Sequence, residues 1–178
     1  MDFPDRIETP RLALRKLRED DADAIFHGYA ADAEVSRLMT WLPHQTLADT
    51  KEYLRGALDR WSDGSEYSYA IEWLDEPSAL LGAISLRPRA AAVSFGYVLK
   101  RSVWNQGIGS EALTTLVDLS LARPNVFRAE AFCDVDNLAS ARVMEKAGMR
   151  FEGILRRYIV HPGISPEPRD CRMYAKVR

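Results

Sequence analysis

The chain has 178 residues, 47% of them hydrophobic, and its 24 basic and 26 acidic side chains leave a net charge of −2. This length is typical of one domain with its own hydrophobic core. The balanced charge argues against a nucleic-acid-binding protein, which would carry a basic excess. No run approaches the roughly 18 apolar residues of a membrane span. We therefore expect a single domain over residues 1–178, with no nucleic-acid partner and no membrane association.

Cysteine and histidine are sparse. Cys133 and Cys171 lie in strand-like segments, and there is no Cys-x-x-Cys pair. The three histidines stand far apart and lack the spacing of a metal site. The first residues also lack the basic and apolar regions of a signal peptide. We expect reduced thiols, no metal and a cytoplasmic location.

The first third of the chain reads as a strand followed by two helices. Residues 11–17 alternate polar and apolar side chains, as in a half-buried strand. Asp20 and Asp21 favour a helix N-terminus, and the helix is expected to run to about Ala31. A second helix is expected to begin at Thr46 and to end near Gly64, which suits a C-terminal cap.

The rest of the chain changes from strands to alternating helices and strands. Three strands with short connections predict an antiparallel meander over 67–73, 80–86 and 92–99, with a turn at 75–78 after the first. Then come a helix over 110–122, a strand over 127–134, a helix capped by Asn137 that ends at Gly148, and a final strand over 171–177. This order predicts a mixed α+β sheet.

The most informative segment joins the third strand of the meander to the next helix. Its glycines, Gly107 and Gly109, let the backbone approach a ligand closely, and the helix begins directly afterwards. Exposed amides and the helix dipole make such a terminus suitable for phosphate or pyrophosphate. A plain tight turn with capping glycines is the alternative.

Two common phosphate-binding motifs fit this segment poorly. A nucleoside-triphosphate loop needs a Lys after its last glycine, and none follows here. Residues 107–112 do match the dinucleotide pattern Gly-x-Gly-x-x-Gly/Ala, and Glu130 lies about 20 residues on. However, residues 100–106 separate the strand from the first glycine, and too little chain remains for a second nucleotide-binding half.

A third pattern fits better. Gly96-Tyr97 followed by Trp104-Asn105-Gln106-Gly107-Ile108-Gly109-Ser110-Glu111-Ala112 resembles the acetyl-coenzyme A loop of the GNAT acetyltransferase superfamily. The branch it resembles contains the ribosomal-protein N-terminal (Rim-type) acetyltransferases. Thr9-Pro10-Arg11-Leu12 resembles the opening strand of that branch, and residues 137–153 resemble its later signature. The resemblance covers nearly the whole chain.

The resemblance implies a GNAT fold, with a mostly antiparallel sheet splayed between its fourth and fifth strands and flanked by helices. Main-chain groups near Leu99 and Arg101 would contact the pantetheine arm of the coenzyme, and an amide near Leu99 would polarise the thioester carbonyl. The pyrophosphate would be held by backbone amides of Gln106, Gly107, Ile108, Gly109 and Ser110.

Two polar residues on the later helix are further candidates. Asn137 would hydrogen-bond the pantetheine arm or simply cap the helix, and the two roles are compatible. Ser140, one turn later, would stabilise or protonate the departing thiolate, although a small residue for close packing is equally compatible. Many GNAT enzymes use a tyrosine further along this helix, where Met144 stands here.

The general base is not evident from the sequence. Residues 154–160, where some N-terminal acetyltransferases carry a carboxylate, have none. A protein α-amine, with a pKa of roughly 7.7–8.0, needs less help from a base than a lysine at about 10.4. Water assisted by a carboxylate such as Glu72 would then suffice. The acceptor site would draw on aromatic and apolar residues that are also core candidates: Tyr29, Met39, Trp41, Tyr67 and Tyr69.

We therefore expect an enzyme that transfers acetyl from acetyl-coenzyme A to a primary amine by direct attack in a ternary complex. The favoured acceptor is a protein N-terminus, and a small-molecule amine is the alternative. A non-catalytic acyl-coenzyme A sensing module is a rival from another class. Such a protein would be a monomer or a homodimer.

Overall fold

The computed structural model describes residues 2–77 and 79–178, so Ser78 of the expected turn lies outside the described residues. The strands are β1 (Arg6–Glu8), β2 (Leu12–Lys16), β3 (Tyr67–Trp73), β4 (Leu80–Arg89), β5 (Ala92–Leu99), β6 (Arg128–Asp134), β7 (Arg150–Val160) and β8 (Pro168–Val177). The α-helices are α1 (Ala22–Ile25), α2 (Ala33–Ser36), α3 (Leu47–Asp63), α4 (Ile108–Leu121) and α5 (Leu138–Lys146).

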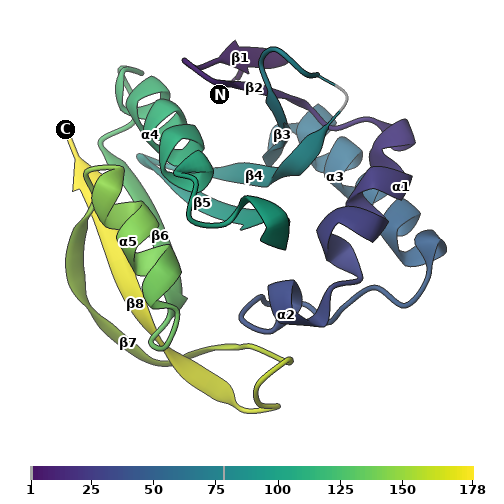
Figure 1. The fold of residues 1–178 in the computed structure, drawn as a ribbon. Coiled ribbons are helices and arrows are strands. Elements are labelled where there is room, and N and C mark those ends of the chain that lie inside the picture. Colours follow the sequence, from purple (N-terminus) through teal and green to yellow (C-terminus); the bar gives the residue numbers. More distant parts are fainter. Residues whose placement is uncertain (1, 78) are drawn as a thin grey trace.

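The strands form one sheet in the order β1-β2-β3-β4-β5-β6-β8-β7 (Figure 1). The β5–β6 pair is parallel, and the other described strand pairs are antiparallel. The expected mixed, mostly antiparallel α+β architecture is therefore confirmed.

The parallel pair is short. Ala92–Phe95 pair with Arg128–Ala131, and beyond this point β5 and β6 move apart (Figure 1). The short strand β1 was not predicted from the sequence. When it is left out of the numbering, β5 and β6 are the fourth and fifth strands, so this is the expected splay. The wedge between β5 and β6 is the feature around which the site is built.

Helices cover both faces of the sheet, and each face has its own hydrophobic cluster. One cluster includes Leu113 and Leu116 of α4 and Met144 of α5. The other includes Ile25 of α1 and Leu54 of α3. None of the helices in the described part of the chain is both long and apolar enough to span a bilayer.

Local signals account for several helix boundaries. Thr46 accepts a hydrogen bond from the N–H of Asp49, and the Asp49 carboxylate accepts one from the N–H of Thr46, which is a capping box. Gly64 ends α3 in the left-handed region, with φ +76°. The helix expected over 20–31 is a succession of a 3-10 turn (Glu19–Asp21), α1 and a π-helical turn (Phe26–Ala30).

Strand boundaries differ more from expectation. The segment 150–160 is the long edge strand β7, which the sequence analysis did not predict. Strand β4 continues through Pro88, where a break was expected. Strand β3 starts at Tyr67, opposite Leu86, so it does not extend as far as Pro88. The side of Pro88 that lacks an N–H therefore faces no neighbouring strand, and no hydrogen bond of the sheet is lost. The last strand begins at Pro168, three residues earlier than expected.

Candidate active site

The loop between β5 and α4 forms an open helix N-terminus. Gly107 precedes α4 with a left-handed φ of +79°, and no side chain caps the helix. The N–H of Glu111 donates to the carbonyl of Gly107 (3.0 Å). The amides of Ile108, Gly109 and Ser110 lie before it, in the turn that has no intrahelical acceptors. These amides and the positive end of the helix dipole suit a pyrophosphate.

A polar contact fixes this loop to the start of the chain. The Glu111 carboxylate accepts hydrogen bonds from Thr9 Oγ1 (2.6 Å) and from Nε (2.7 Å) and the backbone N–H (2.9 Å) of Arg11. Arg11 also donates to the carbonyl of Gln106 (3.2 Å). Burial alone would raise the pKa of Glu111, but these hydrogen bonds lower it overall. The two sequence motifs around Thr9 and Gly107 are therefore parts of one structure.

The backbone of Leu99 faces the wedge. Lys100 donates its N–H to the carbonyl of Leu81 on β4 (2.9 Å). Since neighbouring residues of a strand direct their main-chain groups to opposite sides, Leu99 and Tyr97 direct theirs away from β4 and toward the gap beside β6. The carbonyl of Leu99 accepts a hydrogen bond from the indole of Trp104 (2.9 Å). The orientation of the Leu99 amide is thus the one that the sequence-based role requires.

Two other residues of this loop have contacts within the protein. Arg101 begins a 3-10 turn (Arg101–Val103), and its largely exposed side chain lies 3.5 Å from the carboxylate of Asp32. The Gln106 amide donates to the carbonyl of Ser102 (3.0 Å), so this side chain stabilises the loop.

On the opposite side of the wedge, the start of α5 brings three polar groups together. Asn137 caps α5 by accepting a hydrogen bond from the N–H of Ser140 (3.0 Å). Ser140 Oγ lies 2.7 Å from the hydroxyl of Tyr97 on β5, and that hydroxyl also donates to the carbonyl of Ser140 (3.1 Å). Tyr97 therefore connects β5 to the start of α5 across the wedge, a role that its position in the Gly-Tyr motif did not reveal.

Two ionisable groups beside Ser140 keep their protons at neutral pH. Burial raises the pKa of Tyr97 far above its ordinary value, despite its hydrogen bond to Ser140. Burial also raises the pKa of Cys133 to about 11. Because the thiolate is the nucleophilic form of cysteine, Cys133 is a poor nucleophile here.

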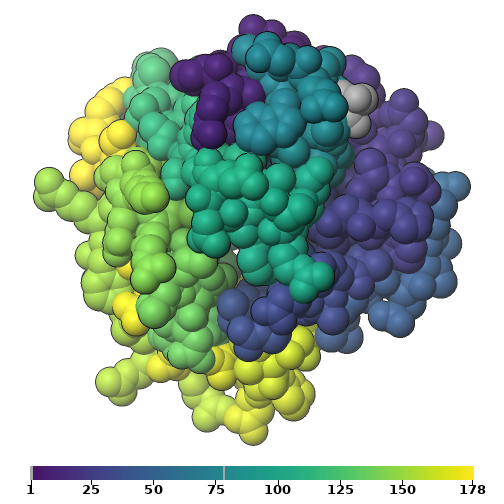
Figure 2. All heavy atoms as spheres, viewed as in Figure 1, coloured from purple at the N-terminus to yellow at the C-terminus, as the bar shows by residue number. Residues whose placement is uncertain are grey.

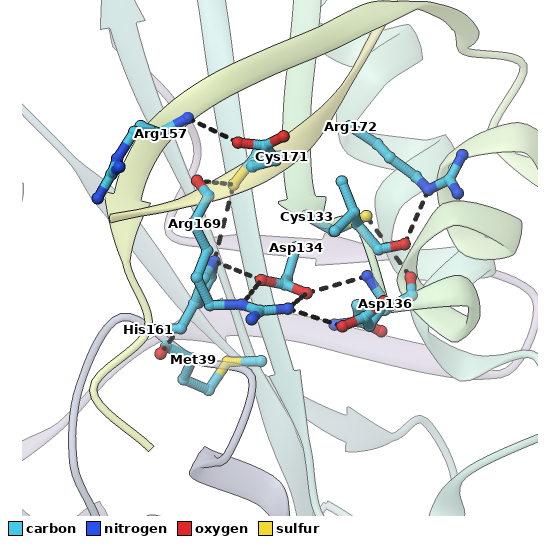
Figure 3. A network of polar contacts seen from close by, with 12 residues as sticks. Met39, Cys133, Asp134, Asp136, Arg157, His161, Arg169, Cys171 and Arg172 are labelled. Atoms are coloured by element: carbon cyan, nitrogen blue, oxygen red, sulfur yellow. Dashed lines mark hydrogen bonds and ion pairs between the residues drawn. The ribbon is translucent and has the colours of Figure 1, made fainter. Parts of the chain in front are cut away.

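An ionic network supports the start of α5 (Figure 3). The fully buried carboxylate of Asp134, at the end of β6, accepts hydrogen bonds from Arg169 Nε (2.6 Å) and from the N–H of Asp136 (2.9 Å). Arg169 also pairs with Asp136 (2.7 Å). Burial alone would raise the pKa of Asp134, but Arg169 lowers it overall. The network fixes the turn that carries Asn137.

His161 extends this network to the N-terminal half of the chain. Its Nδ1 lies 3.2 Å from the carbonyl of Met39, and its Nε2 lies 3.7 Å from the Cys171 sulfur. A Cβ on Gly163 would lie 2.9 Å from Arg37 Cα, so the β7–β8 loop packs tightly on the segment after α2. In Figure 2 these blue and yellow-green segments touch in the lower part of the view.

A cleft of about 250 Å³ opens next to the wedge. It extends from Ser140 and Tyr97 to Arg60 and Arg87, and residues 38–41 form part of its wall. Two of the five candidate acceptor residues, Met39 and Trp41, line this cleft. The other three are core residues: Tyr29, Tyr67 and Tyr69.

Glu72 does not have the environment of a general base. The residue is 2% exposed, and its carboxylate accepts hydrogen bonds from Nε (3.0 Å) and Nη2 (2.7 Å) of Arg15. Arg15 also pairs with Asp21 (2.6 Å). Glu72 is outside the residues that line the cleft. Buried in this ion pair and away from the cleft, Glu72 is not accessible to an acceptor amine, so the geometry gives its expected role as a base no support.

Across the described residues, no group of three or more His, Cys, Asp or Glu side chains could hold a metal ion. The open α4 terminus and the Leu99 amide instead fit an elongated co-substrate with a pyrophosphate at one end.

Comparison with known proteins decides the family. A family model described as an acetyltransferase (GNAT) domain matches residues 11–150. The chain belongs to the GNAT acetyltransferase family. The predicted family and enzyme class are thereby confirmed, and acetyl-coenzyme A is the acetyl donor of this class.

Individual relatives agree with the GNAT assignment. The uncharacterized N-acetyltransferase p20 of Bacillus licheniformis is 28% identical over 152 residues, 84% of this chain and 85% of that protein. A solved GNAT acetyltransferase from Bacillus anthracis is 26% identical with a TM-score of 0.83, covering 97% of this chain and 98% of its own. RimL, a ribosomal α-N-protein acetyltransferase solved with coenzyme A disulfide-bonded to a cysteine, shares the fold at 24% identity and a TM-score of 0.84, covering 97% of each chain.

Proposed function

We propose that this GNAT enzyme acetylates the N-terminal α-amine of a peptide or protein by direct attack in a ternary complex. The observation that carries the proposal is the continuity between the wedge and the cleft. Tyr97 and Ser140 lie at their junction and also line the cleft. An amine that enters through the cleft therefore reaches a thioester placed beside the Leu99 amide.

The chemistry assigns separate roles to the groups around the junction. The neutral amine attacks the thioester carbon, and the Leu99 N–H stabilises the negative charge that develops on the carbonyl oxygen. When the carbon–sulfur bond breaks, the Ser140 hydroxyl passes its proton to the thiolate and takes one back from water, and Tyr97 orients the serine hydroxyl. The attacking nitrogen loses its own proton to water. Gln106 to Ser110 and Asn137 hold the coenzyme.

Two observations support direct attack on an α-amine. The cleft thiol of Cys133 stays protonated, because burial raises its pKa to about 11, so an acyl-cysteine intermediate is disfavoured. The carboxylate in the cleft, Glu66, is already engaged in ion pairs with two arginines, Arg60 and Arg87. An amine with a pKa of about 7.7–8.0 is partly neutral at pH 7 and needs less help from a base than a lysine does. RimL, which shares the fold, is named as an α-N-protein acetyltransferase.

The test is an acceptor screen that measures the release of coenzyme A thiol. It compares peptides with a free N-terminus, the same peptides blocked at the N-terminus but containing lysine, and small amines. We expect turnover with the free N-terminus and a rate that levels off above about pH 8, where the α-amine is neutral. Turnover of lysine or small amines in place of the α-amine would contradict the proposal. Calorimetry with acetyl-coenzyme A measures binding of the donor independently.

A further inference from the structure

The end of the cleft away from Ser140 carries a cluster of charges that the proposed reaction does not use. Glu66, which is 8% exposed, accepts hydrogen bonds from Arg60 Nε (3.0 Å) and from Nε (3.2 Å) and Nη2 (3.1 Å) of Arg87. Ser68 Oγ donates to the same carboxylate (3.1 Å). Two guanidinium groups face one carboxylate, so the cluster has a net charge of +1.

Both arginines remain accessible and have donors to spare. Their side chains are 40% and 42% exposed, respectively, whereas the Glu66 side chain is 10% exposed. Arg87 Nη1 makes no hydrogen bond within residues 2–77 and 79–178. The same holds for both Nη atoms of Arg60. An arginine has five N–H donors, and Glu66 uses only part of this set.

The sequence leaves space around both guanidinium groups. A Cβ on Gly96 would lie 3.4 Å from Arg87 Nη1, and a Cβ on Gly56 would lie 3.0 Å from Arg60 Nη1. Ser68 pairs with Ser85, which pairs with Gly96, so a polar row crosses β3, β4 and β5 next to the cluster. This row gives the otherwise largely apolar cleft a polar strip beside the arginines, and Gly96 leaves the space next to Arg87 free of a side chain.

We propose that Arg60 and Arg87 form a subsite that binds a carboxylate of the acceptor. This inference rests on the proposed function and specifies its substrate class. Arginine recognises carboxylates through paired hydrogen bonds, and the net positive charge of the cluster attracts an anion. The carboxylate comes from an acidic side chain near the peptide's N-terminus or from the C-terminus of a very short peptide.

The spacing of the subsite limits which acceptors fit. Arg87 Nη1 lies beside Gly96, three residues from Leu99 on the same strand, and a strand advances about 3.3 Å per residue. Gly96, the β5 residue beside the subsite, is therefore about 10 Å along the strand from Leu99. A free amino acid, with one carbon between its amine and carboxylate, is too short. An extended peptide advances about 3.3–3.6 Å per residue, so its second or third residue reaches the arginines.

The experiment compares matched acceptors that differ only in charge. One pair is the peptide amides Ala-Ala-Glu-Ala and Ala-Ala-Gln-Ala, which tests a side-chain carboxylate. The other is tri-alanine as its free acid and as its amide, which tests a terminal one. For the wild-type enzyme we expect the KM of the acidic member to be about tenfold lower, as for one charge-assisted hydrogen-bonded contact. This preference should shrink as salt is raised.

Variants of the arginines identify the source of the preference. Arg87→Gln and Arg60→Gln should bring the two KM values together by raising that of the acidic peptide, with kcat for the neutral peptide and KM for acetyl-coenzyme A unchanged. Arg89→Gln on β4 and Arg55→Gln on α3 remove the same charge at exposed positions outside the cleft and should keep the preference. Equal KM values in the wild type, or a loss that affects both peptides equally, would overturn the subsite.

A binding measurement separates this inference from the proposed function. The N-acetylated peptides are titrated into the coenzyme A complex by calorimetry, which needs no turnover. If no peptide is acetylated but the acidic product binds more tightly, and Arg87→Gln abolishes that difference, the subsite stands and the proposed reaction fails. If acidic and neutral products bind equally, the subsite is wrong even when α-amines are acetylated.

Discussion

At the scale of single residues, the site depends on groups whose protonation is set by burial. Tyr97 and Cys133 both lie next to Ser140 at the junction of wedge and cleft, and burial raises the pKa of each. Neither provides an anion at neutral pH. Ser140 is thus surrounded by neutral hydrogen-bonding groups, which suits a residue that passes a proton to a leaving thiolate.

Replacing Ser140 tests this role. Ser140→Ala should lower kcat by about 100-fold or more, the usual contribution of general acid catalysis, with KM for acetyl-coenzyme A nearly unchanged. Tyr97→Phe should lower kcat less, because it removes only the group that orients the serine. Steady-state kinetics across pH measures both effects, with Ser62→Ala on the exposed face of α3 as control. An unchanged rate for Ser140→Ala would exclude it as the acid.

For Cys133, unlike Ser140, we expect substitution to have little effect on kcat. Because its thiol stays protonated, Cys133→Ala should retain kcat within about threefold, as expected for a small packing change rather than a lost nucleophile. Initial rates at varied concentrations of both substrates should give intersecting double-reciprocal lines, as in a ternary complex. Parallel lines together with an inactive Cys133→Ala would indicate an acyl-cysteine intermediate instead.

At the scale of elements, the loop before α4 was predictable because its signals are local. Gly107 adopts the left-handed conformation that the glycine pattern indicates, and the helix begins directly after it. Asn137 and Thr46 cap their helices as their residue types predict. Strand β7 was not predictable, because most of its residues are exposed and Arg157, with φ +47°, interrupts its register.

Contacts between residues that lie far apart in the chain could not be predicted from the sequence either. Glu72 was predicted to be an accessible carboxylate, because its ion-pair partner Arg15 lies 57 residues earlier in the chain. The arginine pair in the cleft was equally hidden, because Arg60 comes from α3 and Arg87 from β4, and no motif joins them. A local pattern predicts a loop or a cap, whereas an ion pair across the sheet depends on the final register.

The two glycines of the coenzyme loop should respond differently to substitution. Gly107→Ala forces an alanine into the left-handed region, at a cost of about 1–2 kcal/mol, and should raise KM for acetyl-coenzyme A. At Gly109 a Cβ meets only side chains, 3.4 Å from Leu99 and 3.6 Å from Val143, so Gly109→Ala should be milder. Calorimetry of acetyl-coenzyme A binding measures both variants. A larger loss at Gly109 than at Gly107 would contradict this order.

At the scale of the whole molecule, hydrogen-bonded carboxylates couple stability to pH. The pKa values of Asp134 and Glu111 are lowered in the folded protein. Their contribution is therefore fully present above their unfolded pKa values, about 3.9 for Asp and 4.3 for Glu, and is lost as the pH falls through the lower folded values. The fold should be stable at pH 6 and weaken below about pH 4.

A substitution tests this coupling. Asp134→Asn leaves the Arg169 guanidinium without its buried counter-charge and should reduce the free energy of unfolding at pH 7 by about 3 kcal/mol. It should also flatten the loss of stability between pH 5 and pH 3, because one titrating group has gone. Urea denaturation at several pH values measures both. Asp118→Asn, which breaks a pair with Lys176 at a half-exposed position, is the control.

The short β5–β6 pairing has a consequence for motion. The two parts of the sheet, β1–β5 and β6–β8, share only the ladder from Ala92 to Phe95 with its partners on β6. Past that ladder, the main-chain groups of Tyr97 and Leu99 face a gap that a bound co-substrate would occupy as an additional strand. In the free enzyme these two amides should exchange their hydrogens with solvent quickly, and acetyl-coenzyme A should slow them more than any amide in the β3–β4 ladder.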